Sequence, residues 1–253
     1  MITGTQVTAT ETADKAGIPV ASFDFSKVKT DLESLLRAGV HFGHLSSRRQ
    51  PKMRQYIYET RKNIDIVDLE QTAIALESAG KFLASVAKSG KPILVVGMKK
   101  QTHGIVLGFA QSLGLLYMVD RFIGGTLTNF ACIQKRALYL KSELEKMSRD
   151  EYQHLTKFEQ SRKGEELERL EKKMGGLKEM KERPGAIIIA DAKEASIALK
   201  EAARMGVPVV AIVDTNTNPS SIEYPIPGND DAVSSLHILF SCLGKYITDA
   251  KTK

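Results

Sequence analysis

Short apolar runs alternate with amphipathic stretches along most of the chain, and this alternation constrains the fold more than any other feature. The runs are Ile64–Val67, Pro92–Gly97, Leu115–Val119, Ala186–Ala190 and Val207–Val213. Each is short, nearly continuous in apolar character and closed by a polar residue or glycine, as is typical of a strand buried on both faces. The intervening stretches, at about 70–89, 102–114 and 194–206, are amphipathic, and a last helix is expected at about 231–247 after the turn at Gly228. We therefore predict an α/β fold with a parallel sheet and helices on both faces.

One long interval interrupts this alternation. More than sixty residues separate the run that ends at Val119 from the run that begins at Ala186, far more than a crossover between parallel strands needs. Residues 129–183 contain fourteen Lys and Arg and eleven Asp and Glu, and their apolar residues form two ladders with steps of three and four. The ladders are Ile133, Ala137, Leu140, Leu144 and Met147, and then Leu167, Leu170, Met174 and Leu177. We predict an antiparallel coiled-coil hairpin that projects from the sheet, and the alternative is two helices lying flat on it.

The N-terminal segment differs in composition from the rest. Residues 1–28 are rich in Thr, Ala and Gly and show no apolar period, which predicts a flexible tail. The predicted organisation is therefore this tail, one α/β domain built from residues 29–128 and 184–248, and the insertion at 129–183. No run approaches the roughly 18 apolar residues of a membrane span, and Cys132 and Cys242 lack metal-type spacing. We expect a cytoplasmic protein that does not bind a membrane.

An enzyme on this scaffold would carry a recognisable phosphate loop or nucleophile, and the sequence contains none of the common ones. It has no G-x-G-x-x-G, no G-x-x-x-x-G-K-[ST] and no G-x-S-x-G. Asp191 and Asp214 each follow an apolar run, so they could hold a structural Mg²⁺ at the carboxyl edge of the sheet, or act only as caps and turn residues. His41 and His44 are three apart and are a weak candidate for zinc. We predict no catalytic residue and no required cofactor.

A basic segment carries the positive charge of the chain. Between Leu35 and Lys62 there are seven Lys and Arg against one Glu, a local net charge of +6 that equals the net charge of the whole chain. Phe42, Tyr56 and Tyr58 are interleaved with these cations. Lys and Arg contact phosphates, and aromatic rings stack on unpaired bases, so this segment predicts an RNA-binding loop. The alternative is a solvated loop with no partner.

A second basic and polar patch follows later strands. Lys99 and Lys100 come directly after one apolar run, and Arg121 comes after the next. The segment Ile123–Asn129 contains the pair Gly124 and Gly125, which allows a backbone to approach another surface closely. The segment Gly175–Lys178 places two more glycines in the returning helix, where a kink or tight packing is expected.

Six motifs together resemble the bacterial small-subunit ribosomal protein S2 family. They occur in the family's order over about residues 32–247, and each is weak alone. The motifs are Ala38–His44, Pro51–Met53, Ile123–Asn129, Gly175–Lys178, Ala211–Asn216 and Ile226–Ala232. Two departures stand out: Arg49-Gln50 replaces the family's usual Trp-Asn, and Phe122 replaces a usual Trp. Packing at those two points must therefore differ from that of the family.

The resemblance implies a flavodoxin-like parallel sheet with an inserted coiled-coil hairpin. It also implies a non-catalytic, ribosome-bound protein that contacts small-subunit ribosomal RNA and neighbouring proteins including ribosomal protein S1, rather than a free homo-oligomer. The expected RNA contacts are Arg48, Arg49, Lys52, Arg54, Arg61, Lys62, Lys99, Lys100, Arg121 and Lys178. The expected structural residues, which shape the loops, are His41, Phe42, Gly43, His44, Gly124, Gly125 and Asn129. Two competing hypotheses are a nucleotide-binding enzyme and a protein-interaction module that works through the hairpin alone.

Overall fold

The centre of the protein is a parallel sheet of five strands, seen in a computed structural model that describes residues 12–13, 19–25, 31–149, 152 and 156–251. The strands are β6 (Ile93–Gly97), β7 (Leu116–Val119), β8 (Ala186–Ile189), β9 (Val209–Val213) and β10 (Tyr224–Pro227). They lie in the order β10-β9-β8-β6-β7, and every neighbouring pair is parallel. Counted along the chain this is the order 2-1-3-4-5 of flavodoxin-like sheets. The parallel sheet is confirmed.

Alternate residues of each strand face two separate cores, because side chains switch faces at every residue of a strand. On β6, Val95 belongs to the core beneath α2 (Leu69–Lys88), α3 (Lys100–Leu113) and α7 (Val233–Lys251). Leu94 belongs to the opposite core with α6 (Ser196–Met205) and the bases of the two inserted helices. Helices therefore cover both faces, which explains the continuous apolar runs of the strands.

Two strand predictions need correction. Ile64–Val67 is a strand, β5, but it lies outside the parallel sheet, in an antiparallel sheet of order β3-β5-β4 with β3 (Phe42–Leu45) and β4 (Ile57–Arg61). Lys62 and Asn63 both have positive φ, the backbone that a tight two-residue hairpin needs, so β4 and β5 pair directly. The fifth parallel strand, β10, was not predicted. It contains Pro225 and Pro227, which lack an amide N–H and are tolerated because β10 is an edge strand.

Part of the predicted tail is packed. Val20, Ala21, Phe23 and Phe25 lie against the core, the Ala21 amide donates to the Gly104 carbonyl at 3.1 Å, and the Phe23 ring stacks on His237 at 4.6 Å between centroids. Residues 20–25 therefore pack on the domain, and the flexibility of the tail stays a prediction. Residues 12–13 and 19–20 pair as β1 (Thr12–Ala13) and β2 (Pro19–Val20), and the remainder of 1–28 lies outside the described residues.

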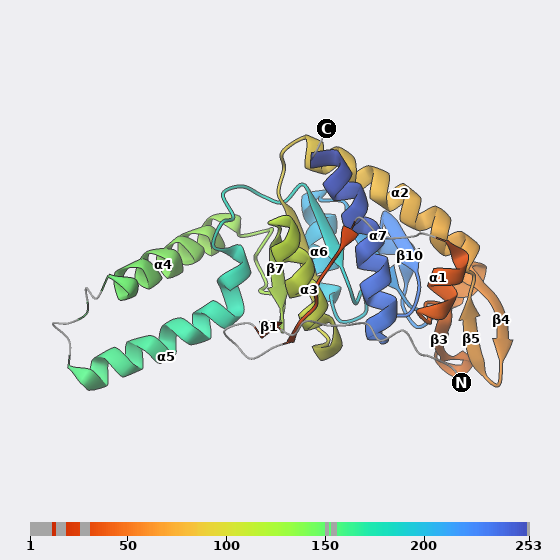
Figure 1. Cartoon of the computed structure of the whole chain (residues 1–253), viewed down its shortest axis with the longest axis horizontal. Coiled ribbons are helices and arrows are strands. Elements are labelled where there is room, and N and C mark those ends of the chain that lie inside the picture. The colour runs from red at the N-terminus through yellow and green to blue at the C-terminus, as the bar shows by residue number, and fades with distance from the viewer. Residues whose placement is uncertain (1–11, 14–18, 26–30, 150–151, 153–155, 252–253) are drawn as a thin grey trace.

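The insertion forms two helices, α4 (Phe130–Ser148) and α5 (Lys157–Met174), followed by a 3-10 turn, η4 (Gly175–Leu177). Figure 1 shows both helices extending away from the sheet, at the end of the molecule opposite α1 (Leu32–Arg37) and the β3-β5-β4 sheet. A buried carboxylate joins them. Glu143 of α4 forms an ion pair with Lys163 of α5 at 2.9 Å and accepts a hydrogen bond from the Tyr152 hydroxyl at 2.7 Å. These bonds, led by Lys163, lower the pKa of Glu143 to about 2.

Gly176 anchors the insertion to the sheet, because a Cβ there would lie 2.1 Å from the Tyr117 carbonyl oxygen of β7. The predicted close packing of this glycine pair is thereby explained for Gly176.

None of the helices in the described ranges has the length and apolar character of a membrane span.

Candidate nucleic-acid interface

The His-Phe-Gly-His segment is docked on the carboxyl edge of the parallel sheet. The His44 amide donates to Thr215 Oγ1 at 2.9 Å, and the Asn229 amide donates to the Val40 carbonyl at 3.0 Å. A Cβ at Gly43 would lie 2.5 Å from Thr215 Cγ2, so only glycine allows this approach. The segment therefore ties β3 to the loops that follow β9 and β10.

His44 joins two loops through both ring nitrogens. Nδ1 lies 3.0 Å from Asp214 Oδ2 and Nε2 lies 3.4 Å from Asp231 Oδ2. The hydrogen bond with Asp214 raises the pKa of His44 against the opposing effect of burial. His41 is different: its Nδ1 is buried without a hydrogen-bond partner in the described structure, and burial lowers its pKa. Among the described residues, the possible metal ligands that lie within 4.8 Å of one another are His44, Asp214 and Asp231. His41 does not belong to this group, so a zinc ion shared by His41 and His44 loses support.

Lys99 forms two further ion pairs at this edge of the sheet. Its Nζ lies 2.7 Å from Asp230 Oδ1 and 2.7 Å from Asp231 Oδ1, and only 16% of its side chain is exposed. Burial alone would lower the pKa of Lys99, but its hydrogen bonds to the two carboxylates raise it on balance. Burial raises the pKa of Asp230 to about 6 even though Lys99 opposes this. The edge at which parallel sheets usually bind a ligand is thus occupied by ion pairs of the protein itself.

The two aspartates that could hold Mg²⁺ have separate partners. Asp191 Oδ2 accepts from the Met98 amide at 2.8 Å and from the Lys99 amide at 2.6 Å, while its Oδ1 is buried without a partner in the described structure. Asp214 accepts from the amide and hydroxyl of Thr215 and pairs with His44. Each aspartate already has protein donors, and a magnesium ion between them remains a prediction.

The basic segment divides into inward and outward cations. Arg49 forms a two-pronged ion pair with Asp65, whose carboxylate is fully buried; Nε donates to Oδ2 at 2.7 Å, and Nη2 donates to Oδ1 and to Thr60 Oγ1. This bond lowers the pKa of Asp65. The neighbouring Gln50 amide donates to the Thr215 carbonyl at 2.8 Å. The other five predicted contacts are exposed, namely Arg48, Lys52, Arg54, Arg61 and Lys62.

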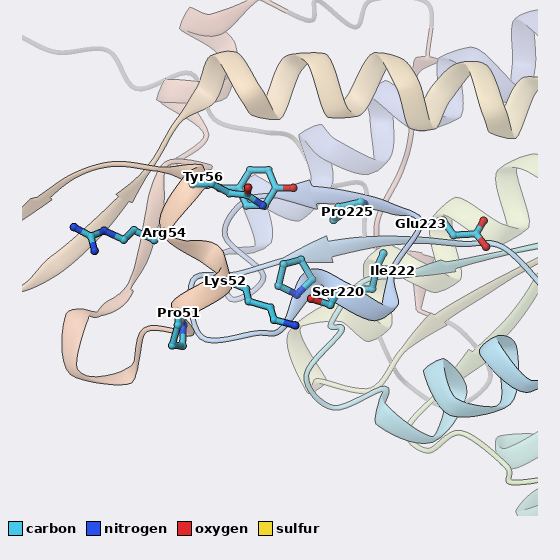
Figure 2. Close-up of a pocket in the computed structure, with 10 residues that line it drawn as sticks. Pro51, Lys52, Arg54, Tyr56, Ser220, Ile222, Glu223 and Pro225 are labelled. Atoms are coloured by element: carbon cyan, nitrogen blue, oxygen red, sulfur yellow. The ribbon is translucent and has the colours of Figure 1, made fainter.

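A groove of about 810 Å³ opens beside the outward cations. One wall is η3 (Pro51–Tyr56), and the other is η5 (Pro219–Ser221) with the start of β10. In Figure 2, Lys52 extends toward Ser220, the Tyr56 ring lies on the side of Pro225, and the Arg54 guanidinium points away from the other labelled residues. The groove thus combines the Lys52 cation with one aromatic ring, the two kinds of group that RNA recognition uses.

The glycine loop after β7 is fixed by a residue that sequence reasoning missed. The Glu201 carboxylate of α6 accepts from the amides of Gly125, Leu127 and Thr128, the last two at 3.0 and 3.2 Å. Gly124 is exposed, and Asn129 is the N-cap residue of α4 without a side-chain cap bond. Asp65, Thr215, Asp230 and Asp231 were missed as partners as well. These pairings join residues far apart in the chain, and no local pattern signals them.

The second group of predicted RNA contacts is also mixed. Lys99 points inward as described, whereas Lys100 and Arg121 are exposed. Lys178 pairs with Glu171 at 2.5 Å and is partly buried. The structure thus leaves Lys100 and Arg121 available to a partner and gives Lys99, Arg49 and Lys178 internal partners.

Fold and site together define a structural class: a flavodoxin-like α/β protein whose usual ligand edge carries ion pairs of the protein itself, beside a cleft of about 330 Å³ that His44, Asp214 and Asp231 help to line. The sequence model of the ribosomal protein S2 family matches residues 35–250. The chain is 42% identical over 220 residues to "Small ribosomal subunit protein uS2" of Treponema pallidum, covering 87% of this chain and 75% of that protein. The proteins of the same name from Salinibacter ruber and Dehalococcoides mccartyi are 44% identical over 216 residues (85% of this chain, 67% of that protein) and 41% identical over 222 residues (88% and 91%). The chain belongs to the ribosomal protein S2 family, whose members are structural, non-enzymatic proteins.

Proposed function

We propose that this chain, as a structural component of the small ribosomal subunit, binds ribosomal RNA through the outward cations of the basic segment. The single observation that carries this is the division described above: Arg48, Lys52 and Arg54 are exposed on a loop whose inner side is fixed, and Arg61 and Lys62 are exposed at the β4-β5 hairpin turn. Arg49 and Gln50 hold that loop to Asp65 and Thr215. A loop held in place loses little conformational freedom when it binds, so its cations are well placed for phosphate contacts.

The predicted contacts are not equal under this proposal. Lys100 and Arg121 join the exposed group. Arg49, Lys99 and Lys178 rank last because each is partly buried beside a carboxylate partner. Arg61 also pairs with a carboxylate, that of Glu59 at 2.6 Å, but its side chain is exposed. Tyr56 and Lys52 both line the groove in Figure 2, so an unpaired base could stack on the ring while Lys52 contacts a phosphate.

The proposal extends to the insertion and to the setting of the protein. We infer that residues 129–183 act as an antiparallel coiled-coil hairpin inserted into the domain formed by 29–128 and 184–248, with α4 and α5 joined by Glu143 and Lys163. The exposed Leu138 and Met147 of α4 leave apolar surface for neighbouring ribosomal proteins. We further propose a cytoplasmic, ribosome-bound protein with ribosomal protein S1 among its neighbours. A structural Mg²⁺ at Asp191 and Asp214 is a lesser proposal.

Binding to small-subunit RNA at increasing salt tests the proposal. The double variant Arg48→Gln with Arg54→Gln should reduce the slope of log affinity against log salt by about 2, because each phosphate contact contributes about 1. Small subunits separated on a sucrose gradient should carry less of this variant than of the wild type. The matched control, Lys88→Gln with Lys91→Gln, removes two exposed cations. They precede β6, so they lie at the amino ends of the parallel strands rather than at the carboxyl ends. Equal slopes for both variants would refute the basic segment as the RNA contact.

A further inference from the structure

A second cationic site lies where the inserted helices meet the sheet. A cleft of about 270 Å³ is lined by Val119, Asp120 and Arg121 at the end of β7 and by three cations of α5. These three are Arg169, Lys172 and Lys173. Four cations therefore surround the cleft with a single carboxylate. Like charges gathered in one place repel each other, and a bound anion relieves the repulsion.

The chain builds both walls with local geometry. Asp120 has a φ of 67°, and the Arg121 amide donates to the Val119 carbonyl at 2.9 Å, so the chain turns sharply at the strand end. This turn buries Phe122 in the core and leaves Arg121 exposed. Arg121 therefore lines the cleft with an exposed side chain.

On α5, residues 169, 172 and 173 share one face because residues three and four apart on a helix are neighbours. Leu167, Leu170 and Met174 pack into the core beneath the sheet, and α5 contacts β7 directly. The cationic face therefore lies beside the strand end, with all three of its side chains exposed.

The cations of the cleft are available to an outside partner. Arg121 and Lys173 have no ion-pair partner among the described residues. Arg169 and Lys172 have exposed partners one helical turn away, at 3.7 Å from Glu165 and 3.2 Å from Glu168. Such exposed pairs are weak and easily exchanged for a stronger anion. The one carboxylate, Asp120, lies 3.4 Å from His103.

We infer that this cleft binds backbone phosphates of ribosomal RNA, as a second anchor apart from the basic segment. The inference rests on the proposed function. No aromatic ring lines the cleft and Val119 is its one apolar residue, so the lining suits a sugar-phosphate backbone rather than a base. Because one wall is the sheet and the other is α5, a single RNA segment in the cleft would fix the angle of the projecting helices to the sheet. The basic segment lies beyond the edge strand β10, and the cleft lies at the other edge strand, β7. The two sites would therefore contact RNA at opposite edges of the sheet.

The test uses the full chain, small-subunit ribosomal RNA and the variant Arg121→Gln with Lys173→Gln. The slope of log affinity against log salt should fall by about 2, so between 50 and 200 mM salt the wild type should lose roughly tenfold more affinity than the variant. The charge-conserving variant Arg121→Lys with Lys173→Arg should keep the wild-type slope, and a thermal melt checks that both variants fold. The control is again Lys88→Gln with Lys91→Gln.

The outcomes separate this inference from the proposed function. A wild-type slope for the Gln variant, with a reduced slope for Arg48→Gln and Arg54→Gln, would overturn the cleft and leave the basic segment standing. Weaker incorporation into subunits with an unchanged slope on RNA alone would assign the cleft to an acidic protein neighbour and also overturn it. Wild-type protein that binds the RNA with no salt dependence would refute the proposed function, and the cleft with it.

Discussion

The carboxyl edge of the parallel sheet and the basic segment beside it contain the same kinds of charged residue but use them in opposite ways. At the sheet edge, Lys99 and His44 are turned toward Asp214, Asp230 and Asp231 and hold three loops together. In the basic segment, Arg48, Lys52, Arg54 and Lys62 are exposed and have no ion-pair partner among the described residues, and the pairs of Arg37 and Arg61 lie at the surface. The difference shows that the local sequence gives the number of charged residues but does not show whether each side chain points inward or toward solvent. A cation points inward where folding brings a buried carboxylate close to it.

Loss of an inward cation gives the largest expected effect. Lys99→Met leaves Asp230, which is 1% exposed, without its ion-pair partner, and should lower the free energy of unfolding by about 3 kcal/mol. Urea unfolding followed by circular dichroism measures this. The control is Lys100→Met, which removes the adjacent exposed cation and should stay within about 0.5 kcal/mol of the wild type. Equal losses for the two variants would remove the distinction between the regions.

The sheet edge should also respond to pH, with a smaller effect. The folded-state pKa of His44 is raised, so its contribution is complete below the unfolded pKa and is lost as pH rises through the folded value. Asp230, with a folded pKa of about 6, acts in the same direction between about pH 4 and 6, because the folded state holds a proton that the unfolded state has released. The unfolding free energy should therefore fall as pH rises from about 4 to 6 because of Asp230, and fall further above about pH 6.5 because of His44. The fall above about pH 6.5 should be smaller in His44→Asn, and an identical fall in both proteins would show that His44 does not contribute.

Much of the sheet could be predicted because burial on both faces leaves a local signature. Val95 and Leu94 enter different cores, so both must be apolar and the run reads as a strand. The edge strand β10 was not predicted because prolines are usually absent from strands. The packing of Phe23 and Phe25 was not predicted because two aromatic residues without a periodic pattern do not show which surface they contact.

The site was predictable only in part. The excess of cations between residues 35 and 62 is visible in the sequence, whereas the need for glycine at position 43 follows from its contact with Thr215. The partners are not. Arg49 meets Asp65 across a hairpin, and Glu201 meets the glycine loop from 76 residues away, so these contacts exist only after folding.

The central claim is that outward cations bind RNA whereas inward cations hold the fold, and Arg48 and Arg49 test it on adjacent residues. Arg48→Gln and Arg49→Gln remove the same charge, and each variant is measured for the salt dependence of RNA binding and for urea unfolding. We predict that Arg48→Gln reduces the salt slope by about 1 and leaves the unfolding free energy unchanged. Arg49→Gln should lower the unfolding free energy by about 1–3 kcal/mol, because buried Asp65 loses its partner, and should leave the slope nearly unchanged. The reverse pattern, or equal effects on both quantities, would contradict the account.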